Sequence, residues 1–192
     1  MDVLAEQDLL RASSDAVVDA LGLNQSLAAL GDPVRVGSSA LGLMVRRDID
    51  ITVVCPSLGM AVHEAVVRIG AELARHHRVV RVSFRNDTGS WNTDPDYPDG
   101  FYLGVGYQSP LGEDWNLDIW FVDEPDRQPD LGHLRSMPAR LTPETRIAIL
   151  EIKLAYADRP EYGKSVTSYD IYRAVLDDGV RTAEEFDLRR AL

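Results

Sequence analysis

Apolar and polar residues alternate along residues 48–55, where Ile49 and Ile51 stand between polar neighbours. A period of two predicts a β-strand with one buried face, and it places Asp48 and Asp50 together on the opposite face. Two carboxylates side by side repel each other unless a positive charge lies between them. The pattern therefore suggests a divalent metal at this strand, although a solvated sheet face is the ordinary explanation for such a pair on its own.

Hydrophobic periodicity, turn residues and helix caps predict the other elements of the chain. The predicted strands are 34–37, 48–55, 78–85, 101–108 and 115–122. The predicted helices are 3–21, 39–46, 58–76 with Ser57 as its N-cap, 142–157, 167–177, and a last one that begins near Thr182.

This order of elements indicates an α+β fold, in which a mixed β-sheet is flanked by helices. We expect an N-terminal helical segment over residues 1–29, a sheet-bearing core over 30–125 and a C-terminal helical region over 126–192. Residues 86–100 are dense in Asn, Asp, Pro and Gly, which predicts a loop. The loop is long enough for a flap over a functional site, and a variable surface insertion is the alternative.

Composition and charge narrow the function classes. The chain has 45% hydrophobic and 27% charged residues, which is ordinary for a globular protein. Its net charge of −11 disfavours a long nucleic-acid partner, which needs a basic surface, and is compatible with a small cationic substrate. We expect no membrane association, because no apolar stretch is long enough to span a bilayer and the first residues lack a signal-peptide pattern. The single cysteine, Cys55, excludes an internal disulfide and favours a cytoplasmic location.

A third carboxylate stands on a later predicted strand. Asp118 lies between the apolar residues Leu117 and Ile119, and Asp114 and Asp123 are the alternatives near the ends of that strand. If the three carboxylates converge on one point, as we expect, they are a suitable set of ligands for Mg²⁺, which prefers carboxylate and phosphate oxygens. Each of these features has an ordinary explanation alone, and their combination and order favour a metal site.

The spacing of these residues resembles that of the nucleotidyltransferase superfamily, which has the polymerase-beta-like fold. The resemblance rests on the Gly37–Ser38 pair at the end of a strand, the Asp48-x-Asp50 strand and the later Asp118. It covers residues 30–125, and the C-terminal helices are similar, more loosely, to those of small antibiotic nucleotidyltransferases.

The resemblance implies the chemistry of the site. Asp48, Asp50 and Asp118 would be the catalytic residues and the ligands of two Mg²⁺ ions, with Asp118 orienting the attacking hydroxyl or accepting its proton. Gly37 and Ser38 would hold the triphosphate of the nucleotide. Ser39 could share that contact, and a plain helix N-cap is the alternative.

Two lysines are candidates for a further contact with the triphosphate, because several related enzymes place a lysine there after the third carboxylate. Lys153 lies on an otherwise apolar predicted helix, and Lys164 lies in the segment between two helices. For each lysine the alternative is a surface residue whose aliphatic part covers apolar groups.

The predicted activity is the transfer of a nucleoside monophosphate, AMP from ATP, to a hydroxyl of a small molecule such as an aminoglycoside or lincosamide antibiotic. The partners would be a nucleoside triphosphate and a small-molecule acceptor, with no membrane and no nucleic acid. The enzymatic alternative is a protein-AMPylating or antitoxin-type nucleotidyltransferase. The other alternative is a non-catalytic nucleotide-binding module, against which the presence of all three carboxylates argues. The oligomeric state stays open.

Overall fold

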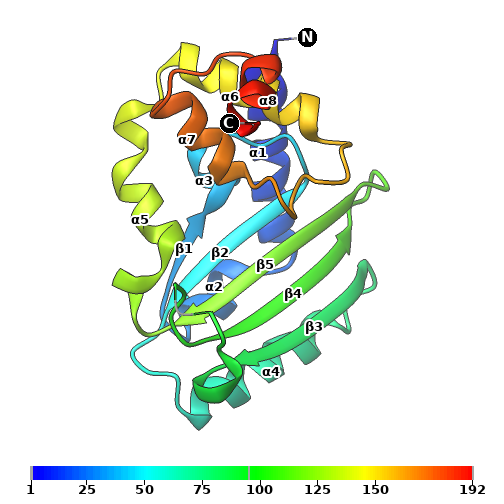
Figure 1. The fold of residues 1–192 in the computed structure, drawn as a ribbon. Coiled ribbons are helices and arrows are strands. Elements are labelled where there is room, and N and C mark those ends of the chain that lie inside the picture. The colour runs from blue at the N-terminus through cyan, green and yellow to red at the C-terminus, as the bar shows by residue number, and fades with distance from the viewer. Residues whose placement is uncertain (1, 95, 192) are drawn as a thin grey trace.

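The computed structural model describes residues 2–94 and 96–191, and in these ranges five strands form one sheet with helices on both faces (Figure 1). The strands are β1 (Asp32–Val36), β2 (Asp48–Val54), β3 (Val79–Asp87), β4 (Gly100–Gln108) and β5 (Asp114–Val122). The α-helices are α1 (Val3–Ala20), α2 (Leu23–Ala28), α3 (Gly37–Leu41), α4 (Met60–Leu73), α5 (Pro129–Ser136), α6 (Pro143–Tyr156), α7 (Ser168–Leu176) and α8 (Ala183–Arg190).

The strand order is β1-β2-β5-β4-β3, so β5 lies between β2 and β4 in space although it is the last of the five strands in sequence. β2 and β5 pair in parallel, and every other pair in this sheet is antiparallel. The mixed sheet with flanking helices confirms the predicted α+β class. The parallel pair is the feature that matters for the site, because it aligns two strands that both carry aspartates.

One face of the sheet packs against helices and forms part of the main hydrophobic core. Ile49 and Ile51 of β2, and Leu117 and Ile119 of β5, are at most 4% exposed, as their alternation with polar residues predicts. Helices α1, α2 and α4 cover this face (Figure 1). Burial of these side chains is the principal source of stability for the sheet, and it fixes which residues point to the other side.

A second core lies among the C-terminal helices. Ile149 and Ile152 of α6 are fully buried together with Ile171 of α7 and Phe186 of α8, and Leu43 joins them from the segment after α3. This core attaches the C-terminal helices to α3 and the segment that follows it, beside the sheet. None of the helices in the described ranges is both long and apolar enough to cross a bilayer. The division into 1–29, 30–125 and 126–192 stays a prediction.

Two helix predictions were wrong in detail, and one short helix was missed. Helix α3 ends at Leu41 instead of residue 46, because Gly42 adopts a φ of 69° and its left-handed backbone stops the helix. Helix α4 begins after Gly59, with no side-chain cap, so Ser57 is not its N-cap. The short helix α2 was not predicted, since six residues give too little periodicity to detect.

Candidate active site

The three predicted aspartates lie on the face of the sheet opposite the main core. Asp48 and Asp50 are the first and third residues of β2, and Asp118 is in the middle of β5. The parallel register pairs Asp50 with Asp118 and Asp48 with Asn116. Paired residues on neighbouring strands share a face, so the three carboxylates gather on the central strands. Asn116 donates from Nδ2 to Oδ1 of Asp48 at 3.2 Å.

The two alternatives for the third carboxylate make contacts away from this group. Oδ1 of Asp114 accepts a hydrogen bond from Nε2 of Gln108 at 3.2 Å, on the hairpin between β4 and β5. Oδ2 of Asp123 accepts one from the backbone N–H of Leu58, also at 3.2 Å. Asp118 is therefore the aspartate of this segment that lies directly opposite Asp50.

Gly37 allows the Asp50 carboxylate to approach the turn between β1 and α3. Its φ of 62° lies in the left-handed region that favours glycine. A Cβ at this position would lie 2.2 Å from Oδ2 of Asp50, so any other residue would displace either the carboxylate or the turn. A phosphate group bound at this turn would consequently lie next to the aspartates.

The carboxylates create an unfavourable local charge. Burial, and then the nearby Asp118, Asp130 and Asp48, raise the pKa of Asp50 to about 7, and Lys153 acts in the opposite direction. A divalent cation would compensate this charge, and carboxylate oxygens are ligands that Mg²⁺ prefers, so the donor set fits Mg²⁺. Among the described residues no three His, Cys, Asp or Glu side chains already converge as a metal cluster, so the aspartates would rotate toward a shared ion.

A tyrosine from the neighbouring strand holds Asp118. Tyr102 of β4 donates a hydrogen bond from its hydroxyl to Oδ1 of Asp118. The hydroxyl lies over Gly104, where a Cβ would come within 2.6 Å of the tyrosine oxygen. Burial, followed by the hydrogen bond to Asp118, raises the pKa of Tyr102 to about 12, so the phenol stays protonated and donates. Tyr102 is thus a positioning residue for the third carboxylate.

Lys153 of α6 reaches the turn that carries Ser38. Its side chain is 2% exposed, and Nζ donates to Oγ of Ser38 at 2.8 Å and to the carbonyl oxygen of Leu43 at 2.5 Å. The hydroxyl of Tyr172 on α7 lies 3.3 Å from Nζ and 3.2 Å from Oγ of Ser38. Burial lowers the pKa of Lys153. No carboxylate of the described residues lies within ion-pair distance of Nζ, so a charge on Lys153 has no direct counter-ion among these residues.

Two cavities meet at Ser38. A cavity of about 140 Å³ lies beside Asp48 and Lys153, and one of about 460 Å³ lies beside Gly37 and Asp50. Together they offer space for a phosphate chain next to the aspartates and for a larger group beyond it. The larger cavity is also lined by Asp96, Tyr97, Asp130, His133, Thr167, Ser168, Tyr169 and Tyr172.

Two of the predicted phosphate ligands, Ser39 and Lys164, do not lie at the cavities beside Ser38. Oγ of Ser39 donates to the carbonyl oxygen of Val36 at 3.2 Å, and Ser39 lines a different cavity on the core side of β1. Lys164 lies in the turn before α7 with an exposed side chain, which makes no hydrogen bond or ion pair within the described part of the chain. Of the two lysines, the structure places Lys153, and not Lys164, against Ser38.

The loop between β3 and β4 contributes to the larger cavity through Asp96 and Tyr97. The flap and the surface insertion both stay open interpretations of this loop. Sequence reasoning missed Tyr102, although the glycine two residues later on the same strand face indicates space for a ring. It also missed Tyr172, whose contact with Ser38 joins residues 134 positions apart and leaves no local signal.

Comparisons with known proteins agree on the fold. No family model matches the chain, and no curated protein sequence matches it. Among solved structures, Cid1, an RNA terminal uridylyl transferase, matches with a TM-score of 0.61 and 16% identity, over 86% of this chain and 46% of its own. Terminal uridylyl transferase 4 from Trypanosoma brucei, solved with dUTP, matches with a TM-score of 0.53 and 17% identity, over 91% and 58%.

A STING-associated CdnE c-di-GMP synthase from Capnocytophaga granulosa also matches, with a TM-score of 0.56 and 12% identity, over 96% of this chain and 65% of its own. The chain spans about half the length of the Cid1 chains. None of these three is an antibiotic-modifying enzyme, so that subtype stays a prediction. The chain therefore has the polymerase-beta-like nucleotidyltransferase fold.

Proposed function

We propose that this protein is a Mg²⁺-dependent nucleotidyltransferase that moves a nucleoside monophosphate from a nucleoside triphosphate to a hydroxyl. The observation that carries the proposal is the pairing of Asp50 with Asp118 on one sheet face, next to the buried Lys153–Ser38 contact. Three carboxylates beside a buried cation match the two needs of the reaction, which are metal ligands and a holder for phosphate. One of the Cid1 structures contains MgATP, which supports Mg²⁺ and a triphosphate as the ligands.

Each side chain has a definite task in this reaction. Lys153, Ser38 and the turn backbone at Gly37 bind and orient the triphosphate. Mg²⁺, when held by the three aspartates, supplies charge neutralisation on the phosphates. Asp118 accepts the proton of the acceptor hydroxyl, whose oxygen attacks the α-phosphorus while pyrophosphate leaves. Tyr102 keeps the Asp118 carboxylate in one orientation during this transfer.

The acceptor in this proposal is a hydroxylated small molecule, and the transferred group is AMP from ATP. The larger cavity is lined by Asp96 and Asp130 in addition to Asp50, and the chain carries a net charge of −11. An acidic lining repels a polyanion and attracts a cationic group, which favours acceptors such as aminoglycosides or lincosamides over RNA.

The test is a transfer assay with each of the four α-labelled ribonucleoside triphosphates and Mg²⁺. The acceptors are a panel of aminoglycosides and lincosamides, a single-stranded RNA, unlabelled nucleotides and the protein itself. We expect a labelled small molecule from ATP, and labelling slower by about 10²–10⁴-fold with the Asp118→Asn variant. Label on RNA, on nucleotides or on the protein would replace the proposed acceptor class while keeping nucleotidyl transfer. Absence of triphosphate binding with Mg²⁺ would overturn the function itself.

A further inference from the structure

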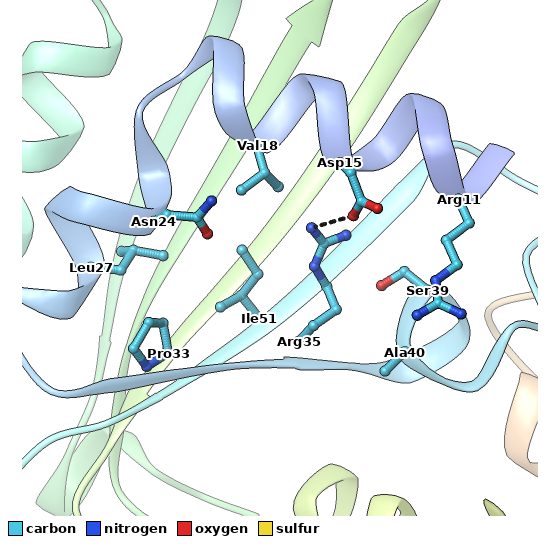
Figure 2. Close-up of a pocket in the computed structure, with 10 residues that line it drawn as sticks. All are labelled: Arg11, Asp15, Val18, Asn24, Leu27, Pro33, Arg35, Ser39, Ala40 and Ile51. Atoms are coloured by element: carbon cyan, nitrogen blue, oxygen red, sulfur yellow. Dashed lines mark hydrogen bonds and ion pairs between the residues drawn. The ribbon is translucent and has the colours of Figure 1, made fainter. Parts of the chain in front are cut away.

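A further polar cavity lies on the core side of β1, opposite the aspartates. It has a volume of about 320 Å³ and lies between α1, α2, β1 and α3. Figure 2 shows the residues that line it, with the side chains of Arg35 and Arg11 both directed into the space below α1. The register pairs Arg35 with Ile51, a core residue, which places Arg35 on the face away from Asp50. This cavity is therefore separate from the candidate active site.

Arg35 is a partly buried cation with incomplete partners. Its Nη1 donates to Oγ of Ser14 at 3.1 Å, and its Nη2 lies 3.4 Å from Oδ1 of Asp15. Asp15 is 64% exposed, so much of its charge is screened by water. A guanidinium has five N–H groups, and these contacts leave most of them without a partner in the described part of the chain. Burial lowers the pKa of Arg35, which indicates that its charge is not fully compensated.

A second guanidinium faces the same cavity. Arg11 lies one helical turn before Asp15 on α1 and forms no ion pair among the described residues. It is close enough to Arg35 to lower the pKa of that residue further. Among the residues that line the cavity these two cations face one carboxylate, Asp15, while Asp50 and Asp19 act on Arg35 from outside the lining. In a chain with a net charge of −11, a cavity in which cations outnumber anions is a local reversal of charge.

We propose that this cavity binds the phosphate group of a small molecule. Two arginines that converge from different elements provide the planar, multidentate donors that phosphate oxygens accept. A volume of about 320 Å³ is at the lower end of the range for small-ligand sites, which suits a phosphate with a small attached group. Ser39 lines this cavity and directly follows Ser38 in the chain, so a ligand here would contact the reverse side of the turn that carries Ser38.

The site goes beyond the proposed transfer reaction and is tested by binding alone, without Mg²⁺. The probes are inorganic phosphate, pyrophosphate and AMP, each followed by calorimetry and by NMR of the backbone amide of Ser39 and the Nε–H groups of Arg11 and Arg35. Sodium chloride at matched ionic strength measures the effect of screening. We expect saturable shifts of these three signals with at least one probe. Inorganic phosphate alone would identify the free ion as the ligand, and AMP binding more tightly would identify a nucleotide.

Variants assign the binding to this cavity. Arg11→Gln removes one charged donor from an exposed helix position, and we expect it to weaken phosphate binding about tenfold or more. Arg68→Gln on α4 is the matched control, an exposed helical arginine away from the cavity, and should leave the affinity unchanged. Arg35→Gln should have the larger effect. If it fails to fold, Arg11→Gln still decides the question.

The active site is the competing location for a phosphate group. Lys153→Met removes the cation at Ser38 and leaves both arginines in place, so binding to the proposed cavity should persist in a folded Lys153→Met variant. Loss of binding in that variant, with full binding in Arg11→Gln, would move the phosphate to the active site and overturn the proposal. Shifts that sodium chloride reproduces would overturn it as well.

Discussion

The two faces of the central sheet are built from alternate residues of the same strands, yet they have opposite effects on stability. Ile119 is fully buried against the core helices, while Asp118, one residue earlier, lies with other carboxylates on the opposite face. Burial of the apolar face is favourable by itself. On the acidic face, burial of Asp50 and then the like charges beside it raise the pKa of Asp50, which costs stability in the absence of a cation. The comparison shows that apolar burial on the core face offsets the free-energy cost of the clustered carboxylates on the acidic face.

Replacing Asp118 should lower the rate of nucleotidyl transfer without lowering the stability of the fold. Asp118→Asn keeps the shape of the side chain and removes its charge, so transfer should fall by about 10²–10⁴-fold, as expected for loss of a general base. The melting temperature without metal should not fall, because one of several repelling charges is removed. Steady-state transfer kinetics and thermal melting measure the two effects. Wild-type transfer rates in this variant would exclude Asp118 as the base.

Replacing Ile119 should produce the converse result. Ile119→Ala creates a cavity in the core and should lower the free energy of unfolding by about 2–5 kcal/mol, measured by urea denaturation. Ile119→Val is the matched control and should cost about 0.5–1.5 kcal/mol. Triphosphate affinity of the folded Ile119→Val protein should be unchanged. A selective loss of transfer in this variant, with stability retained, would contradict the separation of the two faces.

The pH dependence of stability tests the charge on the acidic face. The pKa of Asp50 is about 7 in the folded protein, against an ordinary value of 3.8. The unfolded chain therefore releases this proton first, and the folded state loses stability as the pH rises from about 4 to about 7. Melting temperatures of wild type and Asp50→Asn in metal-free buffer, at about pH 5 and pH 8, should show this loss only in the wild type. Mg²⁺ should raise the wild-type melting temperature more at pH 8, because protons no longer compete for the carboxylate.

The smallest effect is expected at Tyr102. Tyr102→Phe removes the donor to Asp118 and retains the ring, so kcat should fall by about tenfold, consistent with loss of one hydrogen bond to a charged group. The KM for the nucleotide should stay the same, since the proposed contacts of the triphosphate are with Ser38 and Lys153 instead. Tyr107→Phe, on the core face of the same strand, is the control. A change in nucleotide KM with unchanged kcat would argue against a positioning role.

Most of the sheet could be predicted from the sequence, because apolar and polar residues alternate along its strands, as expected for a sheet with one buried face. β2, β4 and β5 fall within one residue of their predicted limits. The end of helix α3 was predicted five residues too late, at 46 instead of Leu41, since the apolar residues Leu43 and Met44 continue the pattern after Gly42 ends the helix. There the backbone leaves the helix and presents the Leu43 carbonyl to Lys153.

The candidate site could be predicted only in part. Asp48 and Asp50 are close in the chain, and their pairing with Asp118 follows once the strands are placed in parallel. The contact of Lys153 with Ser38 joins residues 115 positions apart through helix packing, which one sequence does not encode in any local pattern. Ser39 was grouped with Ser38 because they are adjacent, but successive residues of a helical turn point in different directions.

The place of β5 between β2 and β4 has a consequence for biosynthesis. When the ribosome has made the first hundred residues, β2 already carries Asp48 and Asp50, while the strand that must pair with it has not yet been synthesised. The β3–β4 hairpin can form early from neighbouring residues, but the sheet joins only when β5 arrives and fills the gap. Lys153 follows some thirty residues later. Under the proposed function, a partly synthesised chain therefore lacks both the complete sheet and the α6 lysine, and it gains the ability to hold a triphosphate only after both are in place.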